Sequence, residues 1–145
     1  MIRRATGDDV EAIAALFRRS FRTLDFLPEL HTPEEDRAHL AGVVAEQDVC
    51  VAEEDGRVVG FLALKGDHGT FFYVDPEAHG RGHGSALFEE ARRARPGGFE
   101  FWVFQQNEQA RRFYEHRGCV PVRFTDGSGN EERTPDVLYR WMPSG

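Results

Sequence analysis

The sequence is short of cysteine and contains no long apolar run. Its two cysteines, Cys50 and Cys119, lie in apolar segments typical of strands, so we expect two buried free thiols rather than a disulfide. No stretch reaches the roughly 20 consecutive apolar residues of a membrane-spanning helix. Arg3 and Arg4 lead into a polar segment, which is unlike a secretory signal peptide. These features predict a cytoplasmic protein that does not act at a membrane.

Positive charge is also scarce. The chain has 25 acidic residues against 18 lysine and arginine residues, a formal net charge of −7. That balance argues against nucleic acid as a partner, and it suits a cationic substrate such as an amine. Hydrophobic residues make up 40% of the 145 residues, which is typical of a globular chain. We expect one domain with its own core, spanning residues 1–145.

Hydrophobic period and turn residues predict an α/β fold, one mixed sheet flanked by helices. The expected strands, about seven, are residues 1–5, 49–52, 58–64, 70–74, 99–104, 120–124 and 137–142. The expected helices, about four, begin near residues 7, 33, 84 and 107. Asp55-Gly56 predicts a hairpin and therefore two antiparallel strands. Strand 99–104 is reached through a helix, so it should run parallel to strand 70–74, with a site at their carboxyl ends.

Capping signals mark the first two helices. Thr6 and Asp9 have the spacing of a capping box, and Thr32 with Glu35 repeats that spacing, with Pro33 at the first helical position. The second helix has a thin apolar side, so we expect it to lie on the surface.

One stretch combines three glycines with the start of a helix. Gly80, Gly82 and Gly84 alternate between an apolar strand and the helix that follows. Without Cβ atoms a ligand can approach the backbone, and N–H groups at the helix start can bind phosphate oxygens, with Arg81 as an added charge. No Lys follows the last glycine, which excludes a Walker loop, and Ser85 occupies the third glycine position of a dinucleotide fingerprint. We predict a loop that binds the pyrophosphate of a carrier cofactor; the alternative is a tight structural turn.

These residues resemble a known family. His79-Gly80-Arg81-Gly82-His83-Gly84 is similar to the Q/R-x-x-G-x-G/A loop of the Gcn5-related N-acetyltransferase (GNAT) family, which binds the pyrophosphate of acetyl-CoA. Further along, Asn107, Ala110, Phe113-Tyr114-Glu115 and Gly118-Cys119 resemble the family pattern N-x-x-A-x-x-F-Y-E-x-x-G-F. The chain departs from the family at His79, where Gln or Arg is usual, and at Cys119, where Phe is usual.

The resemblance implies transfer of the acetyl group of acetyl-CoA to a primary amine of a small molecule or peptide, by direct attack. It implies that the backbone of Phe72, Tyr73 and Val74 binds the pantetheine arm, with the Val74 N–H a candidate partner for the thioester carbonyl. Residues His79 to Ser85 would bind the pyrophosphate, namely His79, Gly80, Arg81, Gly82, His83, Gly84 and Ser85.

Two residues of the last helix complete the implied donor site. Asn107 would contact the pantetheine arm, and Tyr114 would contact the donor and act as general acid for the departing thiolate. A phenol with a pKa of about 10 is a sensible donor for that step. Each has a plainer interpretation: Asn107 as a helix cap and Tyr114 as a core residue.

The proton acceptor and the acceptor pocket are less defined. His68 falls near the position where histone-modifying relatives place a glutamate, and an imidazole could deprotonate an ammonium; an exposed turn histidine, with water as the base, is the alternative. The resemblance places the apolar segment Leu24–His31, with Phe26, Leu27 and His31, at a wall of the acceptor pocket. A loop pinned to the core is the other interpretation.

Two hypotheses therefore remain: an amine N-acetyltransferase, and a non-catalytic acetyl-CoA-binding or protein-interaction module on the same fold. His79 and His83 are four residues apart, but the glycines between them make a helical metal-binding face improbable, so we expect no metal. The identity of the amine is not encoded in any motif, and a homodimer stays open.

Overall fold

The computed structural model describes residues 1–143, and its strands form one mixed sheet. The strand order is β1-β2-β3-β4-β5-β7-β6. The strands are β1 (Ile2–Arg4), β2 (Asp48–Glu54), β3 (Arg57–Lys65), β4 (His68–Val74), β5 (Phe99–Phe104), β6 (Val120–Phe124) and β7 (Asp136–Trp141). The helices are α1 (Val10–Arg22), α2 (Pro33–Glu46), α3 (His83–Ala94) and α4 (Glu108–Glu115), with short 3-10 turns at Gly7–Asp9 and Pro76–Ala78. The predicted seven strands and four helices are confirmed.

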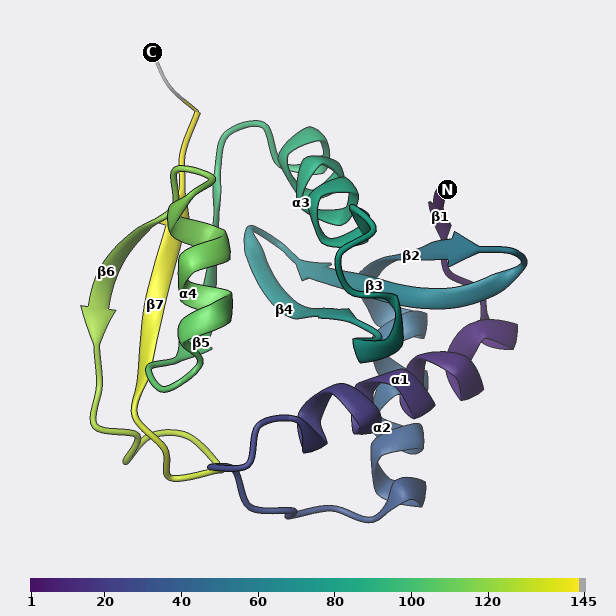
Figure 1. The fold of residues 1–145 in the computed structure, drawn as a ribbon, viewed down its shortest axis with the longest axis horizontal. Coiled ribbons are helices and arrows are strands. Elements are labelled where there is room, and N and C mark those ends of the chain that lie inside the picture. Colours follow the sequence, from purple (N-terminus) through teal and green to yellow (C-terminus); the bar gives the residue numbers. More distant parts are fainter. Residues whose placement is uncertain (144–145) are drawn as a thin grey trace.

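The sheet opens between β4 and β5. These two strands are parallel, as predicted, but their ladder consists of only two pairs, His68 with Glu100 and Gly69 with Phe101. Beyond Gly69, β4 stays paired with β3 as far as Val74, while β5 pairs with β7. Figure 1 shows the result, two wings of sheet that separate below this short ladder.

A β-bulge lies in β4 where the wings begin to separate. The partner of Ala63 is Phe71, and the partner of the next residue, Leu64, is Gly69, so Thr70 is the extra residue on β4. The Thr70 hydroxyl donates to the Gln47 side-chain oxygen at 2.5 Å, which fixes the bulge against the end of α2. Bulges redirect the side chains that follow them. Strand β4 also begins two residues earlier than predicted, so His68 belongs to the strand and not to the turn.

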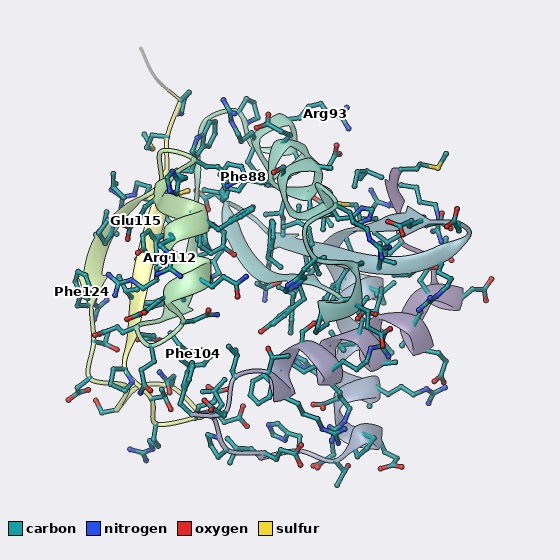
Figure 2. The ribbon with its side chains drawn as sticks, in the orientation of Figure 1. Phe88, Arg93, Phe104, Arg112, Glu115 and Phe124 are labelled. Carbon is teal, nitrogen blue, oxygen red and sulfur yellow. The ribbon has the colours of Figure 1, made fainter. Side chains whose placement is uncertain are left out.

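Two hydrophobic cores lie on opposite faces of the sheet. Helices α1 and α2 cover one face of β2, β3 and β4, with Ile13, Leu40 and Phe61 in that core. Helices α3 and α4 lie on the other face, where Phe88 and Tyr139 belong to the second core. In Figure 2 the labelled Phe88 side chain points from α3 towards the strands, and Arg93 of the same helix points away.

The capping signals act where the sequence predicted. The Thr6 N–H donates to the Asp9 carboxylate at 2.8 Å, and the Thr32 N–H donates to the Glu35 carboxylate at 2.8 Å. Helix α2 buries Leu40 and Val43 and leaves most of its other side chains exposed or half-buried. None of the helices within residues 1–143 is long and apolar enough to cross a membrane.

Both cysteines are free thiols in the described structure. Burial raises the pKa of Cys50 and of Cys119 to about 12. Both therefore remain protonated at physiological pH, and neither is an activated nucleophile.

Candidate functional site

A cavity of about 470 Å³ occupies the opening between β4 and β5; α3 and α4 line it, and so do Ser20, Thr23 and Leu24 at the end of α1. It brings together eleven of the residues singled out from the sequence. These are Phe72, Tyr73, Val74, His79, Gly80, Gly82, His83, Gly84, Ser85, Asn107 and Tyr114. They come from two stretches of the sequence, residues 72–85, which contain β4, the glycine loop and the start of α3, and residues 107–114, which contain α4 and its cap.

The free edge of β4 faces this cavity. Asp75 and Val59 form a hydrogen-bonded pair, with the Asp75 N–H donating to the Val59 carbonyl at 2.7 Å. Because pairing alternates along an antiparallel ladder, Tyr73 also bonds to β3, whereas Phe72 and Val74 direct their backbone groups towards the opening. Of the three residues implied for the pantetheine arm, Phe72 therefore presents its backbone edge and Val74 its N–H, since the Val74 carbonyl already accepts from the Ser20 hydroxyl at 3.3 Å. Tyr73 offers its side chain.

The glycine loop adopts a conformation that other residues avoid. Gly80 and Gly82 have φ of 79° and 84°, in the left-handed region where a Cβ atom is strained. No heavy atom lies within 4 Å of a Cβ built on either glycine, so the backbone angle alone requires glycine. Gly82 precedes α3 and provides no side-chain cap, which leaves the first N–H groups of the helix available to an anion.

Gly84 has a different role from the other two. A Cβ at Gly84 would lie 3.3 Å from the Phe113 ring. Glycine at this position therefore lets the first turn of α3 pack closely against α4. The Arg117 guanidinium lies over the Phe113 ring, 3.5 Å from the ring centre. Arg117 also donates to the Ser85 hydroxyl at 2.5 Å.

A carboxylate from the β2–β3 hairpin bonds two side chains of the loop, Arg81 and His83. Glu54 pairs with Arg81 and lies 2.7 Å from His83 Nε2. The His83 hydrogen bond, aided by Arg81, lowers the pKa of Glu54. His79 Nε2 lies 3.0 Å from the Val74 carbonyl oxygen. The Arg81 side chain does not line the cavity.

Tyr114 lies in an aromatic pocket at the inner end of the cavity. Its side chain is 8% exposed, and its ring centre lies 4.4 Å from that of Phe101. Within residues 1–143 the hydroxyl has no hydrogen-bond partner. It is nevertheless not a fully buried unsatisfied polar atom, because Tyr114 lines the cavity. Burial raises the pKa of Tyr114, so the phenol stays protonated at physiological pH. Asn107 lines the same cavity and caps α4, accepting from the Ala110 N–H at 3.3 Å.

A second cavity, of about 530 Å³, opens on the side of α1 and α2. Its aromatic wall includes Phe17 and Phe21 of α1. Five residues line both cavities, namely Thr70, Phe71, Tyr73, Trp102 and Phe104. The two cavities therefore meet where β4 and β5 separate.

A comparison with known families identifies the chain. Residues 45–119 match the family model described as an acetyltransferase (GNAT) domain. The chain belongs to the GNAT family. It is accordingly an acetyl-CoA-dependent N-acetyltransferase, which decides between the two hypotheses in favour of the enzyme.

Individual GNAT relatives agree with this assignment. The chain is 37% identical to the peptidyl-lysine N-acetyltransferase YjaB of Escherichia coli over 119 residues, which cover 81% of this chain and 80% of YjaB. It is 34% identical to YjaB of Salmonella typhimurium over 119 residues, 81% of each chain. The solution structure of apo YjaB from Escherichia coli superposes with a TM-score of 0.79 at 27% identity, covering 99% of this chain and 98% of that one.

The structure places the remaining predicted site residues less favourably. His68 pairs with Lys65 and Glu100 at the start of β4 and lines neither cavity. Six residues separate it from Val74, about 20 Å along a strand. His31 lines the second cavity. Phe26 and Leu27 do not line either one; the Phe26 ring lies 6.1 Å from that of Phe104.

Proposed function

We propose that this GNAT enzyme transfers the acetyl group of acetyl-CoA to the side-chain amine of a lysine in a peptide or protein. The observation that carries the proposal is the meeting of two cavities at the opening between β4 and β5, one for the donor and one for the acceptor. The curated relatives named above are peptidyl-lysine N-acetyltransferases, which supports lysine as the acceptor.

In this proposal the donor occupies the first cavity as an additional strand. Its diphosphate accepts hydrogen bonds from N–H groups of residues 80–85 at the start of α3. Its pantetheine arm pairs with the free backbone edge of Phe72, next to the Asn107 amide. The thioester then lies near Tyr114, with the Val74 N–H able to bond the carbonyl oxygen and the negative charge that develops on it.

The chemistry proceeds by direct attack. The uncharged amine enters from the second cavity and forms a C–N bond to the thioester carbonyl carbon, and the C–S bond then breaks. As the C–S bond breaks, the sulfur accepts a proton from the Tyr114 hydroxyl. The nitrogen that attacked gives one of its protons to the phenolate, so the products are the neutral amide and the CoA thiol. Burial raises the pKa of Tyr114, and the same apolar surroundings make the thiolate a stronger base, so the proton transfer stays accessible. His68 has no step in this scheme.

The test uses a peptide with one lysine and a blocked N-terminus. Lys65 is the only lysine of the chain, so a Lys65→Arg enzyme cannot acetylate a lysine of its own. We expect mass spectrometry to show one acetyl group on the peptide lysine, with one thiol released per acetyl transferred. Thiol release without peptide acetylation, or equal release with a peptide in which norleucine replaces lysine, would contradict the proposed acceptor.

A further inference from the structure

One carboxylate in the second cavity has no hydrogen-bond or ion-pair partner among the described residues. The cavity is lined by five acidic residues, Glu29, Glu35, Asp36, Glu131 and Glu132. Four of them are engaged: Asp36 with Arg18, Glu29 with Arg22 at 3.0 Å, Glu131 with His31 at 2.6 Å, and Glu35 with the Thr32 N–H at 2.8 Å. Glu132 has neither an ion pair nor a side-chain hydrogen bond in the part of the chain that the structure describes.

Glu132 lies close to the junction with the donor cavity. It belongs to the segment between β6 and β7, and it is half-buried. It shares the second cavity with Tyr73, Trp102 and Phe104, which also line the donor cavity. Burial, together with the negative charge of Glu132, raises the pKa of Tyr73 to about 12.

The surroundings of Glu132 suit one class of ligand. A half-buried carboxylate without a partner is costly to desolvate, and a cation that binds there offsets that cost. The wall contributed by Phe71, Tyr73 and Trp102 is aromatic, and it suits both the methylene chain of an aliphatic amine and its positive charge. An anionic or polar neutral acceptor would gain neither interaction.

We propose that Glu132 binds the ammonium group of the acceptor and so makes the enzyme select aliphatic amines that carry a positive charge. The inference rests on the proposed function, because it assigns the second cavity to the acceptor. It makes Glu132 a specificity-determining residue: the ammonium docks at the carboxylate and loses one proton to solvent water, and the resulting uncharged amine attacks from the junction of the cavities.

Binding measurements test this role without requiring turnover. The probe is the blocked single-lysine peptide, titrated by calorimetry into the protein saturated with CoA; its norleucine analogue is the uncharged counterpart. We expect Glu132→Gln to weaken lysine-peptide binding about tenfold or more, the usual loss for a hydrogen bond to a charged group, and Glu132→Lys to abolish it. Binding of the norleucine peptide should be weak and the same in all variants.

The matched control is Glu46→Gln. Glu46 is exposed at the end of α2 and lines neither cavity, so this variant loses one negative charge elsewhere and should bind the lysine peptide like the natural chain. Equal binding of the lysine and norleucine peptides by the natural chain would overturn the inference. So would unchanged lysine-peptide binding in Glu132→Gln and Glu132→Lys, or an equal loss in Glu46→Gln.

Turnover separates this inference from the proposed function. If the natural chain binds the lysine peptide through Glu132 but transfers no acetyl group, the acceptor site stands and the proposed reaction fails. If the natural chain acetylates the peptide and Glu132→Gln leaves kcat/KM for it unchanged, the reaction stands and the role of Glu132 fails. An arylamine, uncharged at neutral pH, should be acetylated equally by both proteins.

Discussion

Replacing Tyr114 by Phe removes one oxygen atom from the donor cavity and leaves the aromatic packing in place. The ring keeps its contact with Phe101, at 4.4 Å between centres. The hydroxyl makes no hydrogen bond to other described residues, so its loss breaks no interaction of the fold. We therefore expect the free energy of unfolding to change by less than about 1 kcal/mol.

The catalytic effect of the same change should be large. If Tyr114 protonates the leaving thiolate, its removal costs the usual contribution of a positioned acid, about 10²–10⁴-fold in kcat. Acetyl-CoA affinity should be almost unchanged, because the diphosphate and the pantetheine arm bind elsewhere. The raised pKa of Tyr114 further predicts that kcat of the natural chain does not decline with loss of this acid until the pH exceeds about 10, the ordinary pKa of tyrosine.

Three measurements on Tyr114→Phe decide the matter. Thiol release with the lysine peptide gives kcat and KM, calorimetry gives the Kd of acetyl-CoA, and thermal unfolding gives stability. A kcat within about threefold of the natural value, against the expected loss of two or more orders of magnitude, refutes the role of Tyr114. A loss of kcat matched by an equal loss of stability would also refute the reasoning, because the residue would then be structural.

Two further predictions concern the loop and its support. Gly82→Ala places a Cβ at φ 84°, so it should cost about 1–2 kcal/mol of loop stability and weaken acetyl-CoA binding in calorimetry. Gly129→Ala is the control: Gly129 has no positive φ and no atom within 4 Å of the new Cβ, so that binding should be unchanged. Equal binding by both variants would contradict the proposed loop. Asp75 is 1% exposed and pairs with Arg19 at 2.5 Å; burial alone would raise its pKa, but Arg19 and the Glu77 N–H outweigh burial and lower it. The stability that this lowered pKa provides is present above the unfolded pKa of about 3.9 and is lost as the pH falls through the lower folded value. The natural chain should therefore lose more stability than Asp75→Asn between pH 4 and pH 2. Parallel losses of the two proteins in thermal unfolding would show that Asp75 does not contribute.

The parts of the fold that the sequence predicted well depend on neighbouring residues. Capping at Thr6 and Thr32 involves partners three residues away, and the Asp55-Gly56 turn takes the positive φ values, 53° and 77°, that its residue types favour. Gly82 likewise takes a positive φ, 84°, which its residue type favours. These features could be predicted because their cause lies within one turn of chain.

The features that the sequence did not predict depend on contacts across the fold. The bulge at Thr70 shifts the register of β4 by one residue, and that shift depends on pairing with β3 and on packing against Gln47. The turn before β4 contains only Gly66 and Asp67, so His68, predicted in that turn, lies in the strand. The role of Gly84 in helix packing likewise depends on Phe113, which no local pattern reveals.

Two acidic residues were missed for the same reason. Glu54 contacts Arg81 and His83 across separations of 27 and 29 residues. Glu132 reaches the acceptor cavity from a polar segment that resembles an ordinary surface loop. The available signals were the acidic composition of the chain and the acidic residues of this polar segment, residues 126–136, which indicated a cationic substrate but not the residue that would bind it.

The most direct test of the two-cavity account is a crystal structure with a bisubstrate ligand, in which CoA is joined through the acetyl group to the side-chain nitrogen of a lysine peptide. The account predicts the diphosphate at the N–H groups of residues 80–85, the sulfur beside the Tyr114 hydroxyl, and the lysine arm passing between β4 and β5 towards Glu132. A lysine arm that leaves by the same face as the CoA would contradict it, as would a diphosphate bound away from the glycine loop.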